Sequence, residues 1–167
     1  RDIDDVLSVL LLARWAGLVD GNNGQVSLDV APLFESVAAL DAAGPTLTRL
    51  LADPIYRDHL AARGNRQVVM IGYADSNKES GIASSRWLLR RAQEAMLAAC
   101  AEAGVHLLVF HGRGGGISRG GSRTEAVVSS LPTAVAGGQL RVTEQGETIN
   151  DRYGLPPITL RTFEQGL

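Results

Sequence analysis

Short runs rich in apolar and β-branched residues alternate along the chain with longer segments in which apolar residues recur at helical spacing. The clearest run, QVVMIG, is continuously apolar, which is typical of a strand buried on both faces of a parallel sheet. Four strands are expected, at residues 25–31, 67–72, 105–110 and 139–143. Repeated strand–helix units predict a parallel sheet covered by helices, either a barrel or an open doubly wound sheet.

Helices are expected before and between these strands. Residues 2–16 predict a helix with Asp2 as its N-cap and Gly17 as its stop. Apolar residues cover so much of its circumference that we expect it to be buried on several sides. Further helices are expected from near Ser36, from Asp53 and Pro54 to Gly64, over residues 82–103 before Gly104, and from the capping-box pair Ser122 and Glu125 to Pro132.

Length and composition limit the class of protein. At 167 residues and 45% hydrophobic content, the chain is expected to form one domain or part of one. Because it opens directly into a helix pattern and ends without an evident cap, we interpret it as a piece of a longer polypeptide. A net charge of −2 argues against a general nucleic-acid binder. No apolar run near the start is long enough to span a bilayer, and the single cysteine, Cys100, is expected to pack in a helix, which favours a soluble protein of the reducing cytoplasm.

Polar side chains follow every expected strand. Both candidate architectures place function at the carboxyl ends of the strands, so these side chains are expected to share one rim. They are Glu35 after the first strand, Asp75 and Lys78 after the second, His111, Arg113 and Arg119 after the third, and Glu144 and Gln145 after the fourth.

The loop at residues 110–121, FHGRGGGISRGG, has the composition of an anion site. Glycines leave backbone N–H groups uncovered, and arginine forks match the oxygens of phosphate or carboxylate. A flexible glycine turn with solvated arginines is the alternative. The loop is neither a Walker P-loop, which needs Gly-Lys-Ser/Thr, nor a dinucleotide fingerprint, because Ile117 stands where its last glycine belongs.

Glu35 and Asp75 come from two strand ends and suit a hard divalent cation such as Mg2+. Capping of the following helix is the alternative for Asp75. Lys78 adds a positive charge beside the pair or is simply solvated, and His111 positions a substrate, relays a proton, or is a hydrogen-bonded structural residue. Of the other histidines, His106 faces the opposite side and His59 is expected to be solvated, so a structural zinc site is not predicted.

With these residues in place, the sequence resembles phosphoenolpyruvate carboxylase. Four blocks carry the resemblance in the family's order: PLFES, MIGYADSNKESG, FHGRGGGISRGG and LRVTEQGE. It covers nearly the whole chain, from DVLSVLLLARWAGL to YGLP. It implies an α/β fold that is part of a (β/α)8 TIM-type barrel in helix-rich surroundings, with about four βα units present and residues 1–167 as a partial catalytic domain.

The resemblance also implies an activity. The family makes oxaloacetate and inorganic phosphate from phosphoenolpyruvate and bicarbonate with Mg2+ or Mn2+, an anaplerotic carbon dioxide fixation that feeds the tricarboxylic acid cycle. It implies small-molecule substrates, a cytoplasmic homo-oligomer, usually a tetramer, and no nucleic acid or membrane partner. Because the family's upstream histidine, downstream arginines and mobile lid lie outside this chain, we expect the isolated chain to bind weakly, not to turn over, and to self-associate.

By the same resemblance, six residues have assigned roles. Glu35 and Asp75 match the metal-binding carboxylates, and His111, Arg113, Arg119 and Lys78 match catalytic positions. Arg113, Arg119 and Lys78, with the loop backbone at Gly114 and Gly115, are the expected substrate-binding groups. The segment Ser122-Arg123-Thr124 departs from the family's usual small residues and proline, which leaves substrate preference and inhibitor response open.

Three other interpretations stay open. The first is a non-catalytic sensing module that binds phosphoenolpyruvate or another anion through the same loop. The second is a different lyase or kinase-like enzyme on a phosphoenolpyruvate barrel. The third is RNA binding through the two Arg-Gly-Gly triplets, although such triplets usually occur in repetitive, disordered tails.

Overall fold

A computed structural model describes residues 3–122, 126, 129–132 and 141–166. Its strands are β1 (Leu33–Phe34), β2 (Arg66–Gly72), β3 (His106–Gly112) and β4 (Arg141–Thr143). Its helices are α1 (Ile3–Trp15), α2 (Val37–Ala52), α3 (Pro54–Ala62), α4 (Ala74–Ser80), α5 (Ile82–Glu102), α8 (Gly146–Tyr153) and α9 (Pro156–Gly166), with a 3-10 turn η1 (Ile117–Arg119).

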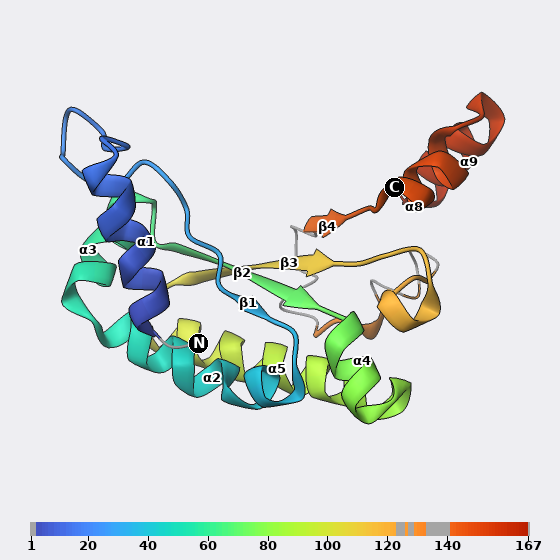
Figure 1. Cartoon of the computed structure of the whole chain (residues 1–167), viewed down its shortest axis with the longest axis horizontal. Coiled ribbons are helices and arrows are strands. Elements are labelled where there is room, and N and C mark those ends of the chain that lie inside the picture. The colour runs from blue at the N-terminus through green and yellow to red at the C-terminus, as the bar shows by residue number, and fades with distance from the viewer. Residues whose placement is uncertain (1–2, 123–125, 127–128, 133–140, 167) are drawn as a thin grey trace.

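The four strands form one parallel sheet in the order β1-β2-β3-β4. Met70 pairs with Leu33 on one side and Phe110 on the other, and Phe110 pairs in turn with Arg141. This arrangement confirms the predicted alternation of parallel strands and helices. Because all four strands run the same way, their carboxyl ends meet at one edge, beside α4 and the glycine loop (Figure 1).

The main core lies between the sheet and two helices. Figure 1 shows α2 and α5 side by side along one face of the sheet. Val69, Ile71 and Val109 point toward them and are buried, as are Leu47 of α2 and Met96 of α5. Burial of a side chain of this size contributes about 1.5–3 kcal/mol, so this layer supplies the main stabilisation of the unit.

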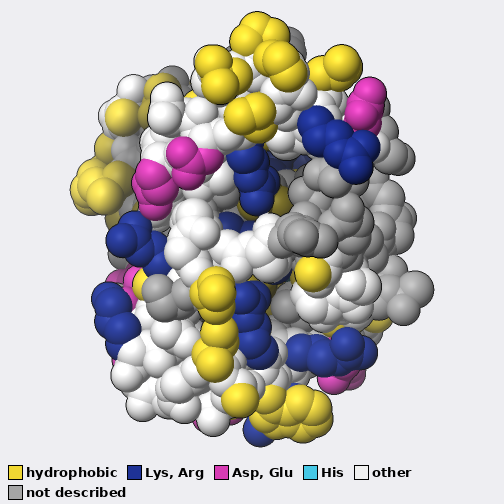
Figure 2. All heavy atoms as spheres, turned by 90° about the vertical axis from the view of Figure 1, so that its right-hand side faces the viewer, with side chains coloured by type: hydrophobic (Ala, Val, Ile, Leu, Met, Phe, Trp, Pro, Cys, Tyr) yellow, Lys and Arg dark blue, Asp and Glu magenta, His cyan; other side chains and the backbone are white. Residues whose placement is uncertain are grey.

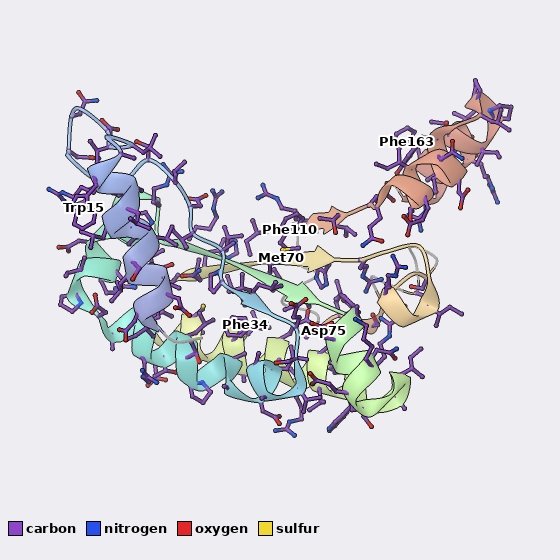
Figure 3. All side chains as sticks on the ribbon, in the orientation of Figure 1. Trp15, Phe34, Met70, Asp75, Phe110 and Phe163 are labelled. Atoms are coloured by element: carbon purple, nitrogen blue, oxygen red, sulfur yellow. The ribbon has the colours of Figure 1, made fainter. Side chains whose placement is uncertain are left out.

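The opposite face of the sheet is also apolar. Met70 and Phe110 lie next to each other on this face, away from α2 and α5 (Figure 3). Both are only half-buried, and Leu33 on β1 is exposed. On the same face, Val68 of β2 and Leu108 of β3 are each only 5% exposed, so the face is accessible mainly toward the carboxyl ends of the strands.

Local sequence signals set most helix boundaries. The Ser36 hydroxyl accepts from Ala39 N–H at the start of α2, and the Asp53 carboxylate accepts from Tyr56 N–H at the start of α3. Gly104, which follows the last turn of α5, has φ +65°, a conformation that glycine adopts without steric penalty. The predicted helix start near Ser36, the predicted N-cap at Asp53 and the predicted stop at Gly104 are therefore confirmed.

The first strand was predicted at the wrong residues. Of residues 25–31, only Val26 forms a bridge, an isolated antiparallel one with Val19, and the sheet is joined at β1 instead. Asp29 interrupts the apolar run, and its carboxylate binds Arg63 at 2.7 Å and Arg66 at 2.8 Å. The run is therefore tied to the start of β2 by an ion pair rather than by strand pairing.

Two predictions of burial were also wrong. Helix α1 buries one face through Val6, Leu10 and Ala13, whereas Leu12 is 58% and Trp15 74% exposed (Figure 3). The apolar residues of a helix show that it can be buried, but they do not show which segment covers it. No described residue covers Leu12 and Trp15.

His59, expected to be solvated, is 3% exposed because it lies on the buried face of α3 with Tyr56, 5.7 Å away between ring centroids. Cys100 is buried as expected, and burial raises the pKa of its thiol to about 11. Its role is therefore packing.

The C-terminal part and the segment after β2 were less predictable. Helices α4, α8 and α9 were not anticipated. Most of the helix predicted from Ser122 to Pro132, and residues 139–140 of the fourth predicted strand, lie outside the described residues. No helix in the described part of the chain is long and apolar enough to cross a membrane.

Gly44 offers a test of the α2–α5 packing. A Cβ at this position would lie 2.9 Å from the Ala95 Cβ of α5, so the Gly44→Leu substitution must separate the two helices. We expect the free energy of unfolding, measured by urea titration, to fall by about 1–3 kcal/mol. Gly21→Ala is the control, because a Cβ at Gly21 would meet no atom within 4 Å; an equal loss in both variants would contradict this packing.

Candidate functional site

The predicted site residues gather at the carboxyl edge of the sheet. Figure 2 looks onto this edge and shows Lys and Arg side chains around the middle of the face. Helix α4 follows β2 directly, and the glycine loop follows β3, so adjacent strands deliver both segments to the same place. This is where parallel α/β sheets bind their ligands.

Three buried side chains form a hydrogen-bonded chain at this edge. Arg113 donates from Nη2 to the Tyr73 hydroxyl at 3.0 Å, and that hydroxyl lies 2.9 Å from Nδ1 of His111. The three residues come from the end of β2, from β3 and from the loop after it. Their exposed fractions are 5% for Tyr73, 0% for His111 and 6% for Arg113.

Arg113 is a buried cation held by neutral groups. Its Nη1 donates to the Gly120 carbonyl at 3.1 Å, its guanidinium lies 4.7 Å from the Tyr73 ring centroid, and Nε has no hydrogen-bond partner. No carboxylate of the described residues forms an ion pair with it. Burying an uncompensated charge is costly, so this arrangement favours a bound anion as the missing partner.

His111 is a neutral imidazole. Burial, and in addition the nearby Arg113 charge, lower its pKa to about 4. Its Nε2 is buried and has no partner among the described residues. Thr143 of β4 fixes the backbone beneath it, donating to the His111 carbonyl at 3.2 Å and accepting from Arg113 N–H at 3.0 Å.

The glycine loop closes on itself, and its glycines are needed for that. A Cβ on Gly121 would collide with the Gly115 carbonyl, and one on Gly114 would lie 2.7 Å from Oε1 of Gln145. Gly120 has φ +88° and packs against the Tyr73 ring, where a Cβ would lie 2.7 Å from Cγ. The loop is therefore a folded turn, closed by hydrogen bonds from Gly114 N–H to the Arg119 carbonyl and from Gly121 N–H to the Gly116 carbonyl.

Arg119 lies on the outer side of the loop. Its side chain is 56% exposed, and it donates to Oε1 of Gln145 at 2.9 Å and lies 3.6 Å from Oε1 of Glu147. Gln145 therefore belongs to the same loop cluster, as its place on the rim predicted. The two arginines are unlike in environment, since only Arg113 is buried.

Glu35 and Asp75 lie at adjacent strand ends. Ser76 N–H donates to the Glu35 carbonyl at 2.9 Å, which joins the end of β1 to the first turn of α4. The Glu35 side chain lies over Gly72, where an added Cβ would be 2.7 Å from Oε2. Asp75, labelled in Figure 3, accepts from Lys78 Nζ at 3.1 Å, and both side chains are solvent-accessible.

Glu35 and Asp75 both carry carboxylate oxygens, which are the type of ligand that a divalent cation such as Mg2+ prefers. Mg2+ is usually held by one or two carboxylates, with waters and substrate oxygens as the other ligands. No group of three or more His, Cys, Asp or Glu side chains that could hold a metal occurs in the part of the chain that the structure describes.

Glu144 has a structural partner. Its carboxylate accepts from Arg152 Nη1 at 2.6 Å, and the pair joins the end of β4 to α8. The Glu144 side chain is thus paired with Arg152 of the helix that follows it, although Glu144 lies after a strand end like the other rim residues.

Two residues of this buried cluster escaped the reasoning from sequence. Tyr73 was part of a matching block but had no role, and Arg86 of α5 was not considered. The Arg86 guanidinium lies 5.2 Å from the Tyr73 ring centroid, and burial together with the Arg113 charge lowers its pKa. For Tyr73, the available signal in the sequence was an aromatic residue directly after an apolar strand. For Arg86, the sequence carried no signal.

Fold and site together define an α/β domain in which a buried arginine without a described carboxylate partner lies at the carboxyl ends of a parallel sheet. The family model described as phosphoenolpyruvate carboxylase matches residues 1–167, and the chain belongs to this family.

Curated relatives carry the same description. One from Xanthomonas euvesicatoria pv. vesicatoria is 55% identical over 161 residues, 96% of this chain. Others are 43% identical over 162 residues in Azorhizobium caulinodans, covering 97% of the chain, and 41% identical over 172 residues in Rhodothermus marinus, covering 98%. The chain spans less than a fifth of the length of these relatives: 18%, 17% and 18% respectively.

The environment of His111 predicts a pH-dependent stability. Its pKa is about 4 when folded and near 6.5 when unfolded, so the unfolded state binds the extra proton between these values. Stability is therefore fully present above about pH 6.5 and falls as the pH drops toward 4, by on the order of 2 kcal/mol at about pH 5. The loss of unfolding free energy is measured by urea titration at about pH 6.5 and at about pH 5.

The substitution His111→Asn isolates this effect from other titrating groups. The variant should lose clearly less stability over the same pH interval, with the remainder including His59, whose pKa burial also lowers. An identical pH profile in both proteins would show that His111 is not buried in its neutral form.

Proposed function

We propose that this chain is part of the catalytic domain of an enzyme that carboxylates phosphoenolpyruvate with bicarbonate, giving oxaloacetate and inorganic phosphate. The observation that carries the proposal is Arg113, a buried guanidinium with no described carboxylate partner, at the carboxyl edge of the sheet. Membership of the phosphoenolpyruvate carboxylase family supplies the substrate class.

The substrates and products of this reaction all carry negative charge. Arg113 would take the phosphate or the developing enolate oxygen, because preplaced cations stabilise charge most effectively where water is excluded. The Nε2 atom of His111, like Nε of Arg113, is buried and has no partner among the described residues, and as a neutral imidazole His111 would donate from it to an oxygen of the same anion. At Gly114 and Gly115 the loop backbone packs directly against Gln145 and Thr148, where a Cβ would lie 2.7 Å from Gln145 Oε1 and 2.9 Å from Thr148 Oγ1, respectively. The backbone of these two glycines would contribute to substrate binding.

Arg119 and Lys78 would act at the exposed side of the same site. Arg119 is held by Gln145 and Glu147, so it can grip an anion that enters above the loop. Lys78 lies beside Asp75 and would place a positive charge near bicarbonate. These two side chains supply charge at the entrance, whereas Arg113 and His111 supply oriented donors inside.

Glu35 and Asp75 would hold Mg2+ or Mn2+. When bound, such an ion supplies Lewis-acid stabilisation of phosphate and enolate oxygens. Asp75 would exchange its contact with Lys78 for the metal, which is an accessible change because both side chains are solvent-exposed in part.

The partly exposed apolar residues on the sheet face opposite α2 and α5 support the proposal of a partial barrel. Met70, Phe110 and Leu33 form an apolar surface that remaining strands of a closed (β/α)8 barrel would bury. We therefore propose that the chain works within a longer, cytoplasmic and oligomeric enzyme with an anaplerotic role, and that residues 1–167 alone do not turn over.

One observation favours a second candidate, a non-catalytic anion-sensing module. The Arg113 site is formed entirely by residues of this chain, whereas Asp75 is engaged with Lys78. A protein that keeps the Arg113 site but lacks a working metal site would bind the anion without catalysing a reaction.

Substitution of Asp75 separates the two candidates. In the full-length protein that contains this chain, Asp75→Asn should lower bicarbonate-dependent phosphate release from phosphoenolpyruvate by about 100-fold or more, with a higher Mg2+ requirement. The reason is that a neutral amide is a much poorer ligand for a hard cation than a carboxylate.

Asp58→Asn, at an exposed position of α3, is the matched control and should behave like the unmodified protein. If the unmodified protein binds phosphoenolpyruvate equally well with and without Mg2+ and releases no phosphate, the sensing module replaces the carboxylase.

A further inference from the structure

We propose that Tyr73 is a positioning residue, whose hydroxyl orients both the Arg113 guanidinium and the His111 imidazole. The inference rests on the proposed function, because it concerns how the two anion-binding groups of that site are held. Tyr73 does not itself need to touch the substrate. Its hydroxyl is within hydrogen-bonding distance of both side chains, at 3.0 Å from Arg113 Nη2 and 2.9 Å from His111 Nδ1.

The direction of these hydrogen bonds follows from the available protons. An arginine has only donors, so the Tyr73 oxygen must accept from Arg113. The single phenolic proton is then free to be donated to Nδ1 of His111, which acts as acceptor. In the reverse arrangement the phenolic proton would have no partner in the described surroundings, although Tyr73 is 5% exposed.

This arrangement sets the tautomer of His111. With Nδ1 accepting, the proton of the neutral ring sits on Nε2. Nε2 is buried and has no partner among the described residues, so its N–H is available to an oxygen of the bound anion. Tyr73 thereby makes Nε2 of His111 a fixed hydrogen-bond donor, while the same hydroxyl holds the Arg113 guanidinium next to the imidazole.

The ring of Tyr73 is itself immobilised. Gly120 packs against it from the glycine loop, and the guanidiniums of Arg113 and Arg86 lie 4.7 and 5.2 Å from its centroid. These contacts depend on the aromatic ring and not on its hydroxyl. A phenylalanine would therefore keep the packing and lose only the two hydrogen bonds.

The test uses Tyr73→Phe in the full-length protein, with Tyr56→Phe as the matched control. Tyr56 is also a buried tyrosine with a hydrogen-bonded hydroxyl, 2.8 Å from Gln67 Oε1, but lies on α3. We expect Tyr73→Phe to lower kcat by about 10-fold to 100-fold, with a smaller change in KM, because loosened donors matter most where charge develops. Tyr56→Phe should change neither constant by more than about 2-fold.

A second background shows whether Tyr73 acts through His111. In His111→Gln, the side-chain amide can place an N–H near the position of Nε2 without any acceptor at Nδ1. Tyr73→Phe should then lower kcat clearly less in this background than in the unmodified protein. Equal fold-changes in the two backgrounds would overturn the inference, as would a Tyr73→Phe variant that behaves like Tyr56→Phe.

Failure of the proposed function would look different. If the unmodified protein has no bicarbonate-dependent activity, the carboxylase proposal fails, and the affinity for inorganic phosphate becomes the readout. Tyr73→Phe must then weaken phosphate binding while Tyr56→Phe leaves it unchanged. Equal phosphate affinity in both variants would overturn the positioning role independently of the reaction.

Discussion

The site depends on one electrostatic constraint, which is that Arg113 carries a positive charge inside the protein without a described anionic partner. A guanidinium in this position loses most of its hydration, and the Gly120 carbonyl and the Tyr73 hydroxyl replace only part of it. A carboxylate at hydrogen-bonding distance would make the protein more stable and would also occupy the place of a substrate. In the free protein the charge of Arg113 is therefore only partly stabilised, and a bound anion would supply the missing stabilisation.

The surrounding fold maintains this arrangement. Parallel pairing of β2 with β3 brings Tyr73 and His111 to the same edge, since Ile71 and His111 are partners in the register. Thr143 of β4 fixes the backbone of Arg113, and the glycine loop folds back so that Gly120 closes over the Tyr73 ring. Each element that holds the arginine comes from a different strand end, which explains why the site requires the sheet.

Sequence reasoning succeeded where local signals decide the structure. The N-cap at Asp53, the helix start near Ser36 and the apolar strands around Val69 and Val109 depend on near neighbours, and all were found where expected. It failed for His59, whose environment depends on how α3 packs. For the site, motifs supplied the rim residues, but neither the burial of Arg113 nor its neighbourhood with Tyr73 and Arg86 follows from spacing, because these features arise from contacts between segments distant in sequence.

Thermal unfolding of the chain and of Arg113→Met, each with and without inorganic phosphate, tests the central claim most directly. Replacing an uncompensated buried charge by an apolar side chain of similar length should leave the Tm unchanged or raise it in the absence of phosphate. Phosphate should then stabilise the unmodified chain more than the variant, whose response reports only the general effect of the salt. If Arg113→Met lowers the Tm equally with and without phosphate, Arg113 is a structural residue and the account is wrong.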